Sequence, residues 1–143
     1  MGIKIFAVLT ASLMLHQGVH AQSPVRWALV LPFQVQADTA GGKVGQRMAL
    51  EFYAGFKAAL DSASSAEEIV LDLYDFDEAT GSVIDHQIGG VVRNYNPKEF
   101  MLLQQQRDVR FVVGPFRAQD SEALAQHSSS STYVVNPVSR DLS

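Results

Sequence analysis

The chain has 143 residues, a formal net charge of −4 and no cysteine. Its eleven basic residues are scattered among fifteen acidic ones, so it lacks the clustered Lys and Arg that a phosphate-binding surface needs, and no nucleic-acid partner is expected. The absence of cysteine excludes a disulfide framework and thiolate chemistry.

The first 21 residues are predicted to be a cleavable signal peptide. Lys4 supplies a positive N-terminal region, and Ile5 to Leu15 form an apolar run that is too short to span a bilayer. Val19-His20-Ala21 then places small residues where a signal peptidase reads. A buried N-terminal strand or helix is the alternative. Cleavage removes Lys4 and changes the net charge from −4 to −5. We therefore expect a periplasmic protein that does not span the membrane, with residues 22–143 forming one domain.

Four short apolar runs predict buried strands. The first of them, Trp27–Leu31, is continuously apolar rather than alternating, which is typical of a strand buried on both faces of a parallel sheet. Each run stops at proline, glycine or a polar residue, which cannot continue a strand well. The runs are Trp27–Leu31, Ile69–Tyr74, Phe111–Val113 and Thr132–Val135.

Helical segments are predicted between these strands. The strongest is Gln46 to Ala63, in which large apolar residues recur every four positions: Met48, Phe52, Phe56 and Leu60. Lys57 and Asp61 are spaced for an ion pair on its outer side. Ser82 to Val92 is interpreted as a helix, although two glycines in its second half disfavour one. Two further helices are predicted at Lys98–Arg107 and Gln119–Gln126. The alternation of strands and helices predicts βαβ units and an α/β fold.

The candidate chemical residues do not form a catalytic set. Asp75 and Asp77 follow a predicted strand, where paired acids could bind a metal or exchange protons; solvated loop carboxylates are the alternative, and the one we favour. His86 and His127 lie about forty residues apart, without a zinc-binding spacing. No GxSxG sequence is present to activate a serine. We therefore expect no catalysis, no metal and no cofactor.

The turn at Gly114-Pro115 has two interpretations. Glycine allows a backbone to approach a ligand closely, and the helix that follows offers free N–H groups to an anion. Asp120 or Ser121 could cap that helix. A plain strand-to-helix turn explains the same residues equally well.

Five segments in order resemble the first lobe of type I periplasmic binding proteins, and are most similar to the branch found beside peptidoglycan-binding LysM modules and to activators of penicillin-binding proteins. The resemblance implies a three-layer, flavodoxin-like α/β lobe with a mostly parallel sheet of strand order 2-1-3-4. It implies binding rather than catalysis. The segments are Ala28–Phe33, Glu51–Asp61, Leu71–Asp75, Phe111–Phe116 and Val134–Ser139.

The resemblance also implies a binding site at the strand ends. A small polar ligand such as an amino acid would be held between two lobes, and the second lobe is absent from this chain. Either the chain is a piece of a longer reading frame, or it is a lone half-domain. The expected function is an exported solute-binding module; the alternative is a regulatory module of envelope or peptidoglycan assembly that binds a protein partner through the same lobe. The implied contacts are Phe33, Gly114, Pro115, Phe116, Asn136 and Ser139.

Overall fold

A computed structural model describes residues 23–35, 42–63, 67–86 and 90–138. The predicted signal peptide and Ser139 lie outside the described residues. Within them, six strands form one mixed sheet in the order β4-β3-β2-β1-β5-β6. The strands are β1 (Val25–Leu31), β2 (Ile69–Asp77), β3 (Ser82–His86), β4 (Val92–Tyr95), β5 (Val109–Val113) and β6 (Tyr133–Val135). The helices are α1 (Gly42–Ser62), α2 (Pro97–Gln106) and α3 (Ala118–Ala125).

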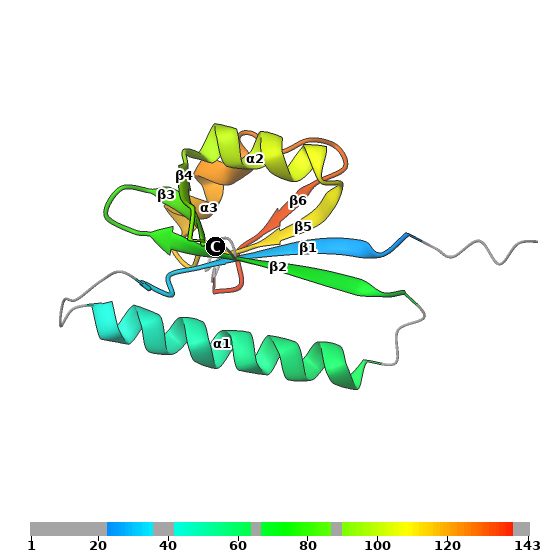
Figure 1. Cartoon of the computed structure of the whole chain (residues 1–143), viewed down its shortest axis with the longest axis horizontal. Coiled ribbons are helices and arrows are strands. Elements are labelled where there is room, and N and C mark those ends of the chain that lie inside the picture. The colour runs from blue at the N-terminus through cyan, green and yellow to red at the C-terminus, as the bar shows by residue number, and fades with distance from the viewer. Residues whose placement is uncertain (1–22, 36–41, 64–66, 87–89, 139–143) are drawn as a thin grey trace, which may run out of the picture.

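The four predicted strands form the parallel part of this sheet. β1 lies in the middle and pairs in parallel with β2 and β5, and β5 pairs in parallel with β6. Figure 1 shows α1 on one side of the sheet and α2 and α3 on the other. The predicted α/β class is confirmed. The predicted order 2-1-3-4 describes the sequence β2-β1-β5-β6, which is only part of a larger, mixed sheet.

The helix predicted for Ser82–Val92 is wrong, because this stretch contains β3 and the start of an antiparallel pairing with β4. A tight turn reverses the chain after β2. In it, the carboxylate of Asp77 accepts hydrogen bonds from the Ala79 N–H (2.9 Å) and the Thr80 hydroxyl (2.7 Å). Gly81 follows with φ +69°, a conformation that favours glycine. After this turn the chain continues as β3, and the side chain of Val83 is fully buried in the core.

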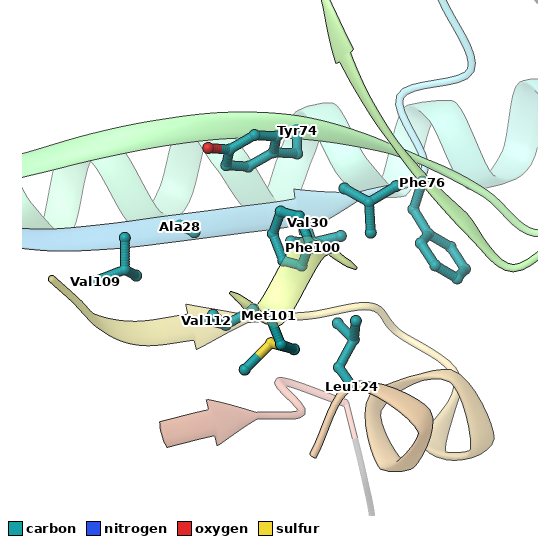
Figure 2. Close-up of a cluster of buried hydrophobic side chains, with 10 residues drawn as sticks. Ala28, Val30, Tyr74, Phe76, Phe100, Met101, Val109, Val112 and Leu124 are labelled. Carbon is teal, nitrogen blue, oxygen red and sulfur yellow. The ribbon is translucent and has the colours of Figure 1, made fainter. Parts of the chain in front are cut away.

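The main core lies between the sheet and helices α2 and α3. Figure 2 shows side chains from β1, β2 and β5 meeting side chains of both helices. The ring of Tyr74 stands edge-on to that of Phe100, with 5.0 Å between their centroids. The ten buried residues of this cluster are Ala28, Val30, Tyr74, Phe76, Val83, Phe100, Met101, Val109, Val112 and Leu124.

Aromatic side chains fill the space between α1 and the other face of the sheet. Trp27 of β1 lies 5.8 Å from Phe56 of the helix and 4.7 Å from Phe111 of β5, measured between ring centroids. The predicted inward positions Phe52 and Phe56 are therefore confirmed. Met48 is exposed and Ala49 is buried in its place. Because one turn of an α-helix takes 3.6 residues, side chains four residues apart are rotated by about 40° around the helix axis. Met48, one turn before Phe52, therefore lies off the side that faces the sheet.

Candidate functional site

The carboxyl ends of the parallel strands lie at one edge of the sheet. The chain passes from β1 to β2 on one side and later to β5 on the other, so a topological switch point lies between β1 and β5. In open α/β sheets, ligands bind beside such a point. We call the residues that follow these strands the strand-end rim: Phe33–Val35, Gly114–Arg117 and Asn136–Val138. The rim contains every predicted contact residue except Ser139.

The backbone at Gly114 is occupied by the fold itself. Its φ is +101°, and a Cβ atom there would collide with the carbonyl oxygen of Val30 in β1. Its N–H donates a 2.8 Å hydrogen bond to the carbonyl of Val135. The glycine is thus required by the close approach of β1 and β5. The turn interpretation explains Gly114 without a ligand.

Asn136 binds the turn after β5. Its side-chain N–H₂ donates to the Phe116 carbonyl (3.2 Å) and to the Ser121 hydroxyl (3.0 Å), while its Oδ1 accepts from the Val138 N–H (2.8 Å). The Ser121 hydroxyl in turn donates to the Pro115 carbonyl at 2.8 Å. The polar groups of this part of the rim therefore bind one another.

The predicted cap of α3 is wrong. The helix begins after Arg117, and neither Asp120 nor Ser121 makes a side-chain capping bond. Instead the Arg117 guanidinium donates to Asp120 Oδ2 (2.6 Å) and to the carbonyl of Glu78 (2.8 Å) in the turn after β2. The hydrogen bond to Asp120 raises the pKa of Arg117. Arg117 therefore connects the first turn of α3 to the turn after β2.

The two rim phenylalanines pack against α1. The ring of Phe33 stands edge-on to Tyr53 at 6.3 Å, and that of Phe116 stands edge-on to Phe52 at 5.7 Å. Both phenylalanines are half-buried. Edge-on aromatic pairs of this kind stabilise packing beyond the area they bury. The two residues therefore hold α1 to the rim, and only part of each ring faces solvent.

The interpretation of Asp75 as a solvated loop carboxylate is wrong, because this residue is only 4% exposed. Oδ1 accepts hydrogen bonds from the Gln34 N–H (2.8 Å) and the Phe76 N–H (2.9 Å), and Oδ2 accepts from the Val35 N–H (3.0 Å). Nε2 of His86 lies 3.5 Å from Oδ2. Backbone donors thus surround the carboxylate, which holds the chain where it leaves β1.

A second polar cluster, which the sequence did not predict, lies on the α2 face. The guanidinium of Arg107 donates to the Tyr74 hydroxyl at 2.6 Å, and the amide of fully buried Gln104 lies 3.5 Å from the same oxygen. Burial raises the pKa of Tyr74. The alternation Asp72-Leu73-Tyr74 in β2 was the available signal, since it puts polar groups on one face of the strand. The cluster ties the end of α2 to the sheet.

Hollows mark the described surface. One of about 610 Å³ lies between β4 and α2. One of about 360 Å³ lies between the end of α1 and β2, and one of about 190 Å³ lies beside α3 and Asn136.

The described residues hold no group of three or more His, Cys, Asp or Glu side chains placed to bind a metal. Among them, no helix has the length and apolar character needed to cross a bilayer.

No protein-family model, no curated protein and no solved structure matches the chain. The resemblance to type I periplasmic binding proteins therefore stays a prediction from the sequence segments.

Proposed function

We propose that the chain is an exported, non-catalytic binding module of the cell envelope, and that its strand-end rim contacts a polypeptide partner. One observation carries the proposal. The side chains of Arg117 and Asn136 in the rim are hydrogen-bonded within the fold, whereas apolar side chains at the same edge are exposed: Val35 by 64% and Val138 by 47%.

The hydrogen-bonding pattern disfavours an amino-acid-sized ligand. Such a ligand is held by a few convergent polar groups that are free to bind its charged ends. Here Asn136 and Ser121 bind the backbone and each other, and Asp75 accepts three backbone N–H groups. Recruiting any of them to a solute would first break a hydrogen bond of the fold, at a cost of about 1 kcal/mol or more.

The apolar side chains favour a protein surface. The centre of a protein–protein interface is depleted of charge and contains apolar and aromatic residues, with a polar border. The rim offers residues of both kinds, since Val35, Phe116 and Val138 are partly or largely exposed and the charged Arg117 follows Phe116 in the chain. In this proposal the partner is a protein of the envelope or of peptidoglycan assembly.

Solute binding is the second candidate, and the switch point between β1 and β5 favours it. The strand order β2-β1-β5-β6 is the order that the first lobe of a type I periplasmic binding protein needs. In this alternative, the rim is one wall of a cleft for a small polar ligand such as an amino acid, and another lobe supplies the second wall. The contacts would be Phe33, Gly114, Pro115, Phe116, Asn136 and Ser139.

Thermal denaturation of the purified protein with single amino acids and muropeptide fragments separates the two candidates. A ligand present at a hundred times its Kd stabilises the native state by about 2.7 kcal/mol, which raises the melting temperature by several degrees. The partner proposal predicts no such rise with any free amino acid. A saturable rise with one amino acid, and not with its mirror image, would establish solute binding instead.

A further inference from the structure

The hollow between β4 and α2 lies far from the switch point in strand order, at the outer edge of the sheet. Strand β4 forms one wall and helix α2 forms the other, and we call this hollow of about 610 Å³ the β4–α2 groove. Its lining residues are Arg93, Asn94 and Tyr95 from the strand and Glu99, Leu102, Leu103 and Gln106 from the helix.

The strand wall offers backbone groups for pairing. Among the described residues, β4 pairs only with β3, so the backbone groups on its outer side have no strand partner. Three of its four residues are exposed. Such an edge is a template onto which an extended chain can add as another strand.

The helix wall offers an apolar surface. Leu102 is 48% exposed, and Leu103 and Tyr95 are half-buried beside it. In the sheet, Tyr95 lies opposite core residue Val83, so its ring faces the α2 side. Arg93, two residues earlier in the strand, projects to that same side. The groove therefore combines an apolar floor with one cationic side chain.

The two walls are held rigidly together by a single linking residue. Asn96 connects β4 to α2 and forms a capping box with Glu99: Asn96 Oδ1 accepts from the Glu99 N–H at 2.9 Å, and Glu99 Oε2 accepts from the Asn96 N–H at 3.2 Å. A preformed groove loses little conformational entropy when it binds. The carboxylate of Glu99 is also engaged in this box.

Charge indicates what the occupant carries. The guanidinium of Arg93 makes no ion pair or hydrogen bond with any described residue, although buried Asp85 is its neighbour in the pairing of β3 and β4. Since Glu99 is held by the helix cap, Arg93 is the charge of the groove that is available to a ligand. A carboxylate is its natural partner, because an arginine can bind both carboxylate oxygens at once.

We propose that the β4–α2 groove binds an extended peptide segment of a partner protein. The segment pairs with the outer edge of β4, places an apolar side chain against Leu102 and Leu103, and places an acidic side chain at Arg93. Because alternate residues of a strand face the same side, the acidic and apolar residues of the segment are two positions apart.

A phage-displayed library of random ten-residue peptides, selected on the purified protein, tests the proposal. Enriched sequences are expected to carry an acidic and an apolar residue two positions apart. Synthetic copies should lose roughly tenfold in affinity with Arg93→Glu and with Leu102→Asp. The control is Arg47→Glu on α1, at the other face of the sheet, which should change nothing. Enrichment without this pattern, no enrichment at all, or affinities unchanged by both groove variants would overturn the proposal.

Strand pairing is tested on the unaltered protein with N-methylated peptides. In an added strand only every second N–H faces β4, so methylation of one alternate set should abolish binding and methylation of the other should be tolerated. Equal affinities for the two methylated forms would contradict pairing with β4. This second measurement needs no variant, so it holds even if Arg93→Glu or Leu102→Asp lowers the melting temperature.

Discussion

The backbone N–H of Gln34 donates a 2.8 Å hydrogen bond to the carboxylate of Asp75, which lies 41 residues later in the sequence. Asp75 stands near the end of β2 and Gln34 follows β1, so the bond fixes how the chain leaves the central strand. Gln34 has φ +51°, a conformation that a residue with a side chain adopts only when its surroundings hold it. Asp75, which the sequence led us to interpret as a solvated loop carboxylate, therefore has a structural role.

Replacing Asp75 should destabilise the fold. Asp75→Ala leaves three backbone N–H groups without their acceptor, and we expect a loss of about 3 kcal/mol in the free energy of unfolding, measured by urea denaturation. Asp61→Ala is the matched control, because Asp61 is an exposed carboxylate whose ion pair with Lys57 should contribute less than about 1 kcal/mol. Equal losses of unfolding free energy for the two variants would show that the hydrogen bonds of Asp75 contribute no more to stability than an exposed ion pair does.

Two glycine substitutions should have opposite effects. Gly114→Ala places a methyl group against the Val30 carbonyl and strains a φ of +101°, so we expect a loss of at least about 2 kcal/mol. Gly55→Ala lies within α1, where a Cβ meets nothing within 4 Å, and should stabilise the protein by about 0.5–1 kcal/mol. Thermal denaturation measures both. A stable Gly114→Ala variant would reopen the possibility that the glycine serves a ligand.

Asn136 distinguishes a structural rim from a ligand site. Asn136→Ala removes two donors and one acceptor from the contacts between β6 and the turn after β5, and we expect a loss of about 1–3 kcal/mol in stability. Asn94→Ala, at an exposed position of edge strand β4, is the control and should cost less than about 0.5 kcal/mol. Unchanged stability of Asn136→Ala would mean that the side chain is free to bind something else.

Asp77 should make stability depend on pH under acidic conditions. The hydrogen bond from Thr80 lowers the pKa of Asp77 below its ordinary value of 3.8. The folded state therefore binds this proton less readily than the unfolded state does, so the stabilisation is present above that value and is lost as the pH falls through the folded-state pKa. Thr80→Val should move the pKa of Asp77 upward, as followed by NMR titration. Its destabilising effect at neutral pH should shrink in acid; an effect independent of pH would contradict this account.

The sequence predicted the parallel part of the fold because its strands are short, mostly apolar runs that end at proline, glycine or a polar residue. The limits of α2 were predicted to within one residue at each end, since Pro97 begins the helix and Asn96 caps it. The hairpin of β3 and β4 was missed. In β3 the buried residues Val83 and Asp85 alternate with half-buried ones, and three of the four residues of β4 are exposed, so the hairpin lacks an apolar run like those of the other strands.

The binding site was harder to predict than the fold. Position in the sequence correctly placed Phe33, Gly114 and Asn136 near the strand ends, because parallel strands end at one edge. It did not reveal that Phe33 packs against α1, that Gly114 bonds to Val135 or that Asn136 bonds to the turn after β5, because contacts between distant residues depend on how the loops meet. The β4–α2 groove was not visible for the same reason: it joins a strand that was not predicted to a helix that was.

Site-specific photocrosslinking at the rim tests the central claim most directly. A photoreactive amino acid at Val35, in cells of the source organism, is compared with the same residue at Leu50, which is also apolar and exposed but lies on α1. The partner proposal predicts a discrete protein adduct from Val35 and none from Leu50. No adduct from Val35, together with a melting temperature raised by one free amino acid, would contradict it and identify the rim as a solute site.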